Sequence, residues 1–209
     1  MRKIIVFLRY KQIILMKLRS YLAGIAAIAS FAGCASPAVW TESERKLIDT
    51  PDSVMRVLTI ADEADSLLLR QPSADISAAE LADPLYAELA RKMVATVTSP
   101  EQDGVGIAGP QVGILRRIVA VQRFDKPGEP FEVYPNIRIT EKRGETEYGR
   151  EGCLSVPGRR GDVLRYKDID ITYTAPSGRD TTERVEGFTA VIFQHETDHL
   201  DGILYIDKL

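Results

Sequence analysis

Histidine and cysteine are scarce in this sequence. Among 209 residues there are two of each, and the formal net charge is −3. Beyond residue 33, lysine and arginine form no run longer than a pair such as the one in GRRG at 158–161. The concentrated positive charge that binds nucleic-acid phosphates is therefore missing, and we expect no nucleic-acid partner.

Internal repeats and low-complexity tracts are absent, and no apolar run reaches the roughly 20 residues that span a membrane as a helix. The hydrophobic content of 44% is normal for a globular core, and the length fits one domain with an appendage. Acidic residues are missing before Glu42, whereas residues 1–33 hold six lysines and arginines. The appendage is therefore N-terminal.

The N-terminal segment has the pattern of an export signal. Its basic part precedes the apolar run YLAGIAAIASFAG at 21–33, and small residues follow. FAGC at 31–34 resembles a bacterial lipoprotein signal, which implies cleavage before Cys34 and a lipid on its sulfur. We expect a cell-envelope protein anchored through lipidated Cys34, in which Cys153 has no disulfide partner. A buried N-terminal helix and a cytoplasmic location are the alternatives.

We divide the chain into a signal peptide at 1–33, a linker with a short helix at 34–54, and a catalytic domain at 55–209. Thr41 and Glu44 form a capping-box pattern that starts the short helix. A second capping box, SAAE, predicts one amphipathic helix over 78–97. Its apolar stripe repeats every four residues and consists of Leu81, Leu85, Leu89, Met93 and Val97.

β-Branched and aromatic runs predict strands at 118–121, 131–139 and 168–174. APSG then predicts a hairpin turn into a further strand at 179–185. Helices before and after the strands indicate an α+β fold with mainly antiparallel pairing.

The last predicted helix, 187–200, contains both histidines of the chain. Its apolar residues and the histidines recur at steps of three or four, in the order Phe188, Val191, Ile192, His195 and His199. Two imidazoles one turn apart on one face can bind the same cation. Glu196 stands beside the first of them, which is the H-E-x-x-H arrangement with a glutamate placed to handle a proton. The alternative is a core helix with hydrogen-bonded histidines.

Two further segments are candidates for the same site. Cys153 lies in REGCLSVPG at 150–158, where glycines let the backbone approach a metal. It is either a third ligand or a small core residue, and composition leaves the two open. The glycine-rich GVGIAGPQVG at 104–113 fits neither a P-loop nor a dinucleotide motif. We expect it to lie extended against a ligand, with Gln111 as a hydrogen-bond donor.

Together, the segments GVGIAGPQ, EGCLS and QHETDH resemble the peptide deformylases in order and spacing, with similarity from about Arg56 to the end. The resemblance implies an α+β fold in which mainly antiparallel β-sheets pack around a metal-bearing H-E-x-x-H helix. It implies a single divalent ion, Fe²⁺ or Zn²⁺, with water as the fourth ligand. The implied protein ligands are Cys153, His195 and His199.

The resemblance also implies the reaction and its residues. Hydroxide attacks the formyl carbon of an N-formylmethionyl peptide or protein. Gln111 and the backbone N–H of Leu154 hold the developing oxyanion, and Glu196 transfers the proton. The methionine pocket consists of Val105, Phe188, Val191, Ile192 and the stem of His195. Gly106 pairs with the peptide backbone. Independently of the resemblance, we expect the chain to be a monomer.

Two supporting features complete this picture. By resemblance, Glu151 and Arg165 form an ion pair that steadies the cysteine loop. Asp198 either supports the ligands or is a solvated helix charge.

Two other functions remain open at the level of sequence. The first is an H-E-x-x-H metallopeptidase, although no histidine remains to act as a third ligand. The second is a membrane-tethered, non-catalytic binder of formyl peptides, which would have no use for a proton carrier such as Glu196. Export also conflicts with the cytoplasmic action of the family. An exported protein would act on formylated peptides outside the cytoplasm, where Zn²⁺ suits the site better than oxidisable Fe²⁺.

Overall fold

The computed structural model describes residues 40–209. The expected signal at 1–33, the expected lipid at Cys34 and the first part of the linker lie outside these residues. Within 40–209, none of the helices has the length and apolar character needed to cross a membrane.

The described chain begins with four helices, which are α2 (Glu42–Ile48), α3 (Glu63–Leu69), α4 (Ala78–Ala82) and α5 (Pro84–Val97). The first sheet follows, with β1 (Gly106–Ala108), the short 3-10 helix η1 (Gly109–Val112), β2 (Ile118–Gln122) and β3 (Phe131–Pro135). The remainder consists of β4 (Arg138–Cys153), β5 (Val156–Thr174), β6 (Asp180–Glu186), α6 (Gly187–Leu200) and the 3-10 helix η2 (Tyr205–Lys208).

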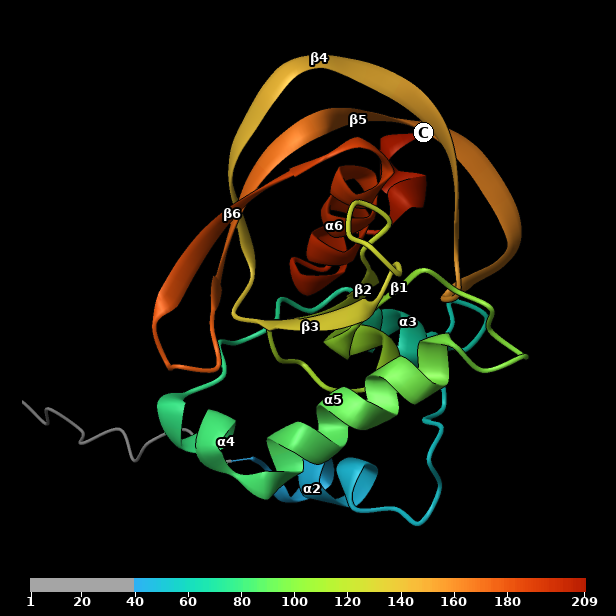
Figure 1. The fold of residues 1–209 in the computed structure, drawn as a ribbon. Helices are drawn as coiled ribbons and strands as arrows, with labels where there is room; N and C mark the ends of the chain where they lie inside the picture. Colours follow the sequence, from blue (N-terminus) through green and yellow to red (C-terminus); the bar gives the residue numbers. More distant parts are fainter. Residues whose placement is uncertain (1–39) are drawn as a thin grey trace, which may run out of the picture. The chain divides into compact units, whose positions relative to one another are not determined.

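The strands form two three-stranded antiparallel sheets, ordered β1-β2-β3 and β4-β5-β6. Helix α6 packs against β5 of one sheet and against β1 and β2 of the other, so that it lies between them (Figure 1). Helix α5 covers the other face of the first sheet. The α+β class with mainly antiparallel pairing around the last helix is confirmed.

The first sheet has a core on each face because its strand residues alternate in direction. Ile107 and Ile118 face α5 and are fully buried in one apolar cluster. Ala108 and Val119 face α6 and are fully buried in the other. The helix that bears the histidines is therefore fixed between apolar surfaces.

Several local predictions are confirmed. Thr41 and Glu44 form a reciprocal capping box at the start of α2. Helix α6 has the predicted bounds, and Gly202 follows it with a φ of 73°, which is the left-handed conformation that ends many helices. β5 and β6 form the predicted hairpin.

The single helix predicted over 78–97 is wrong, because the chain forms α4 and α5 in its place. Asp83 between them has an extended conformation, with a ψ of 134°. Pro84 is the cause, since proline disfavours a helical conformation in the residue before it. Asp83 then caps the second helix by accepting a hydrogen bond from the Leu85 N–H at 3.0 Å. Leu89, Met93 and Val97 are nevertheless buried, as the stripe predicted.

The strand predicted over 131–139 is interrupted as well. Asn136 has a φ of 57°, so the chain leaves β3 and enters β4 of the other sheet. The Asn136 side chain stabilises this turn by hydrogen bonds to the backbone N–H and C=O of Ile76. An asparagine tolerates this conformation better than most residues do.

Strands β4 and β5 extend much further than the sequence indicated, and α3 and both 3-10 helices were not predicted. Along β4 only Glu151 is buried. Because nearly all its side chains reach solvent, β4 lacks the alternation of apolar and polar residues that marks a half-buried strand.

A buried cluster of charged side chains connects helices α2 and α4 to the segment before β2. Arg116 contacts Glu44 of α2 at 2.7 Å and Glu80 of α4 at 3.0 Å, and its guanidinium carbon lies 5.5 Å from the centre of the Trp40 ring. Burial alone would raise the pKa of Glu44, but hydrogen bonds from Arg116 and Thr41 leave it below the ordinary 4.5.

We expect Arg116→Met to lower the free energy of unfolding by about 3–5 kcal/mol, because it leaves two buried carboxylates without a cation. Thermal and urea unfolding followed by circular dichroism measure the effect. The contribution of Glu44 is present above pH 4.5 and lost as the pH falls below that value, so the deficit shrinks in acid. Arg45→Gln, which breaks a more exposed pair with Asp83, should cost at most about 1 kcal/mol. Equal costs would contradict this account.

Candidate active site

Cys153 is the last residue of β4, and a two-residue turn of Leu154 and Ser155 connects it to Val156 at the start of β5. Strand residues two apart point to the same side, so Cys153 and Glu151 both face α6. Within the described residues, Cys153 is a free thiol.

Both histidines come from α6 and point toward Cys153. Cys153 Sγ lies 3.2 Å from His199 Nε2, and one ligand atom from each of the three residues lies within 4.8 Å of the others. His199 is buried and His195 nearly so. The structure thus brings together the three residues predicted as metal ligands.

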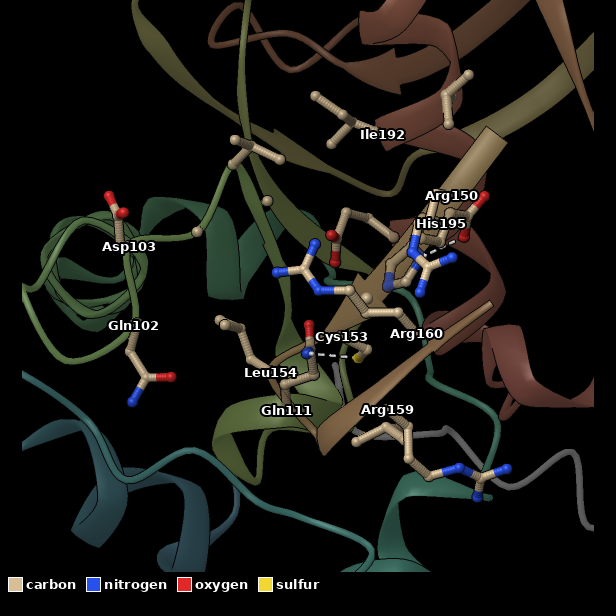
Figure 2. Close-up of a pocket in the computed structure, with 18 of the residues that line it drawn as sticks. Gln102, Asp103, Gln111, Arg150, Cys153, Leu154, Arg159, Arg160, Ile192 and His195 are labelled. Carbon is tan, nitrogen blue, oxygen red and sulfur yellow. Dashed lines mark hydrogen bonds and ion pairs between the residues drawn. The ribbon is translucent and has the colours of Figure 1, made fainter. Parts of the chain in front are cut away.

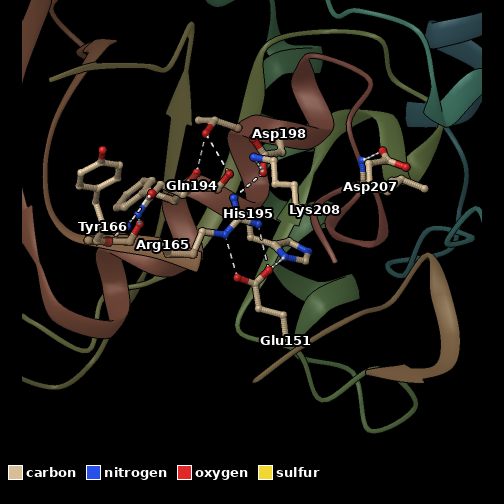
Figure 3. Close-up of polar contacts among 12 residues, drawn as sticks. Glu151, Arg165, Tyr166, Gln194, His195, Asp198, Asp207 and Lys208 are labelled. Carbon is tan, nitrogen blue, oxygen red and sulfur yellow. Dashed lines mark hydrogen bonds and ion pairs between the residues drawn. The ribbon is translucent and has the colours of Figure 1, made fainter. Parts of the chain in front are cut away.

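Glu151 connects the cysteine strand to the histidine helix (Figure 3). Its Oε2 lies 2.8 Å from His195 Nδ1, and both its oxygens accept hydrogen bonds from Arg165, at 2.8 and 2.9 Å. Burial alone would raise the pKa of Glu151, but the hydrogen bonds from Arg165 and His195 lower it to about 2. An ionised Glu151 keeps the proton of His195 on Nδ1, which leaves Nε2 free to bind a cation.

Asp198 belongs to the same network. Its Oδ2 accepts from Arg165 of β5 and from Lys208 of η2, and its side chain is mostly buried. Of the two roles predicted for Asp198, support of the ligands therefore fits better than a solvated helix charge.

Gln111 of η1 is buried, and its amide has a fixed orientation. The Ala108 N–H donates to Gln111 Oε1 at 2.8 Å, which directs the amide nitrogen the other way. That nitrogen donates to Ser155 Oγ at 3.2 Å and lies 3.6 Å from Cys153 Sγ (Figure 2). A hydrogen-bond donor is therefore held beside the cluster of ligand atoms.

Glu196 is buried, and within the described residues its Oε2 has no hydrogen-bond partner. Burial raises the pKa of Glu196 to about 7, which is suited to a group that takes up and releases a proton near neutrality. A Cβ at Gly106 would lie 2.5 Å from Glu196 Oε1. A larger residue where β1 passes the carboxylate would therefore displace the Glu196 side chain.

These groups line a pocket of about 850 Å³. All the residues predicted for catalysis and substrate binding line it, namely Gln111, Leu154, Glu196, Val105, Gly106, Phe188, Val191 and Ile192. Cys153 and His195 also line it, whereas buried His199 lies behind them. Phe188 is exposed although it continues the apolar face of α6, and its ring packs against that of Phe124.

Sequence reasoning gave no role to two contacts of this site. Ser155 accepts from Gln111, a contact that the EGCLS segment containing it does not predict. The Tyr205 ring stacks on that of His195, with centroids 6.0 Å apart. No sequence spacing connects a tyrosine after the helix to a histidine within it.

The donor set fits a divalent metal. One thiolate and two imidazoles are ligands that Zn²⁺ and Fe²⁺ accept, and three protein ligands leave a position for water or substrate. A buried carboxylate with a pKa near neutrality and an amide donor stand next to that position. The arrangement is suited to metal-assisted hydrolysis of an amide.

Comparison with known proteins identifies close relatives. A family model described as polypeptide deformylase matches residues 54–209. A peptide deformylase of Leptospira biflexa is 36% identical over 164 residues, which cover 75% of this chain and 88% of the relative. A peptide deformylase of Synechocystis is 35% identical over 167 residues, which cover 79% and 83%.

Solved structures agree with the sequence relatives. A class I type b peptide deformylase from Acinetobacter baumannii, crystallised with Met-Ala-Ser, is 36% identical with a TM-score of 0.66, covering 75% of this chain and 98% of that one. A peptide deformylase from Thermotoga maritima is 33% identical with a TM-score of 0.65, covering 75% and 97%.

We expect Glu151→Gln to weaken metal binding about 10–100-fold, because a neutral amide oxygen accepts the His195 Nδ1–H less strongly than a carboxylate does and orients the imidazole less firmly. Competition with a chromophoric chelator measures the affinity, and circular dichroism checks the fold. Glu147→Gln makes the same change at an exposed position of the same strand and should leave the affinity unaltered. A folded Glu151→Gln protein with full affinity would rule out this role.

Proposed function

The chain belongs to the peptide deformylase family, and we propose that its Cys153, His195 and His199 bind one divalent ion, Fe²⁺ or Zn²⁺. As a member of the family, the chain is a metal-dependent hydrolase that removes the formyl group from N-formylmethionyl peptides. The observation that carries the site assignment is the cluster of Sγ and imidazole nitrogen atoms beside buried Glu196.

Glu196 is proposed as the proton carrier. The ion, when bound, supplies Lewis acidity that lowers the pKa of water at the site. Glu196 Oε2 has no competing partner among the described residues, so this oxygen accepts the proton of the attacking water. The same oxygen then delivers the proton to the departing amine nitrogen.

Gln111 and the backbone N–H of Leu154 are proposed to stabilise the oxyanion. The Ala108 N–H already directs the Gln111 amide nitrogen toward Cys153, so this donor stands beside the position where charge develops on the formyl oxygen. Leu154 directly follows Cys153, in the turn between β4 and β5. Its N–H therefore belongs to the peptide bond that follows the proposed cysteine ligand.

The substrate is proposed to bind between β1 and α6. The methionine side chain contacts the apolar part of the pocket formed by Val105, Phe188, Val191, Ile192 and the stem of His195. Within the described residues β1 pairs with β2 alone, so its other edge is open to a peptide strand through Gly106.

The location is inferred from the N-terminal sequence. We propose that 1–33 is an export signal and that a lipid on Cys34 anchors the protein in the cell envelope. The basic segment, the apolar run and FAGC support this proposal. The substrates are then formylated peptides outside the cytoplasm, and Zn²⁺, which has no redox chemistry, is the more suitable ion there.

Glu196→Gln should lower formate release from formyl-Met-Ala-Ser at least 100-fold, because the water loses its proton acceptor. Metal content, measured by elemental analysis of the same sample, should stay at the level of the unmodified protein. Glu186→Gln makes the same chemical change at the exposed start of the same helix and should retain activity. Activity surviving in Glu196→Gln would remove the proposed role.

Mass spectrometry of the membrane fraction should detect a diacylated N-terminal peptide that begins at Cys34. Cys34→Ala should abolish this species, whereas Cys153→Ala, which changes the other cysteine, should retain it. An unmodified peptide beginning at Met1 or Met16 in the soluble fraction would indicate a cytoplasmic protein and refute the anchor.

A further inference from the structure

Three arginines line the exposed part of the active-site pocket, namely Arg150, Arg159 and Arg160. Other arginines of the described chain, such as Arg116, Arg123 and Arg165, form ion pairs with carboxylates. None of the three pocket arginines forms an ion pair or a side-chain hydrogen bond within residues 40–209. Their guanidinium groups are therefore available to a ligand in the pocket.

The β-hairpin explains how these charges come to lie beside the reaction centre. Arg160 is opposite Gly152 in the register of β4 and β5, and residues directly opposite each other share a face of the sheet. A Cβ at Gly152 would lie 3.8 Å from the guanidinium carbon of Arg160. The Arg160 side chain thus extends over Gly152, which precedes Cys153.

Arg150 is two residues before Gly152 and therefore shares this face. Glu151 and Cys153 point to the opposite side, toward α6. The hairpin thus separates its functional groups, with ligand and supporting carboxylate on one face and Arg150 and Arg160, together with Asp162 opposite Arg150, on the other. Figure 2 shows the arginines on the hairpin side of the pocket and Asp103 on the other side.

The three unpaired arginines contrast with the acidic character of the chain, whose formal net charge is −3. Glu151 and Glu196 also line the pocket, but the first is paired with Arg165 and the second is buried. Asp103 is the other side-chain carboxylate of the lining, which also includes Leu209, the last residue of the sequence. Positive charge is therefore in excess where the pocket opens to solvent.

We propose that Arg150, Arg159 and Arg160 select peptides that carry aspartate or glutamate a few residues after the formylmethionine. This inference rests on the proposed function, because it takes the pocket as the peptide site. An extended strand advances about 3.3 Å per residue, so the third to fifth residues of a bound peptide lie on the order of 10 Å from the formyl group. Acidic side chains at these positions meet the arginines.

The test compares three peptides of equal length as substrates of the full, metal-loaded chain. Each begins with formyl-Met-Ala and carries serine, aspartate or lysine at residues three to five, counted from the formylmethionine. Exposed ion pairs are individually weak, and several together should raise kcat/KM for the aspartate peptide about threefold to tenfold over the serine peptide. The gain should appear mainly in KM and should decline with added salt. The lysine peptide should be the poorest substrate.

The variant Arg150→Gln/Arg159→Gln/Arg160→Gln should bring the ratio of aspartate to serine peptides close to one. Arg179→Gln is the matched control, since Arg179 is exposed and forms no ion pair in the described chain but lies in the turn before β6, outside the pocket lining. It should keep the full ratio. A ratio of one in the unmodified chain, or an unchanged ratio in the triple variant, would overturn the proposal.

Failure of the proposed function gives a different result. If no peptide releases formate, the deformylase assignment fails at this site. Charge selection is then measured with fluorescently labelled Met-Ala peptides that carry the same serine or aspartate residues. Tighter binding of the aspartate peptide, lost in the triple variant, would support the arginine site, and equal affinities would refute it.

Discussion

The contact on which the site depends is the pairing of Glu151 with Arg165 and His195. One buried carboxylate joins β4 and β5 to α6, and it fixes both the position of the cysteine strand and the proton of an imidazole. Removing the partners of a buried charge leaves an uncompensated group, which is strongly destabilising. Correct folding and correct ligand geometry are therefore determined by the same interaction.

The parts of the fold that depend on short-range signals could be predicted from the sequence. The capping box of Thr41 and Glu44, the extent of α6 and the hairpin of β5 and β6 each follow from residues within a few positions of one another. The break at Asp83 was also readable in principle, because Pro84 stands beside it. The long exposed β4 was not, since pairing with β5 determines it and its own side chains give no apolar pattern.

The candidate site divides in a similar way. The H-E-x-x-H pattern predicted the two histidines and Glu196 from residue types and spacing, whereas Cys153 as the third ligand followed only from the family resemblance. The excess of positive charge at Arg150 and Arg160 could not be predicted, because it depends on the register that places Arg160 opposite Gly152. The stacking of Tyr205 on His195 likewise depends on how the chain returns after α6.

The open edge of β1 limits what the protein can distinguish in a bound peptide. Main-chain hydrogen bonds are the same for every residue except proline. Pairing along Gly106 therefore requires an extended peptide but does not distinguish one side chain from another. Peptides can therefore be distinguished only at the two ends of the pocket. The apolar end selects side chains by shape, and the end that opens to solvent selects them by charge. A wide variety of N-terminal sequences can therefore share one binding groove, and residues between its two ends are free to vary.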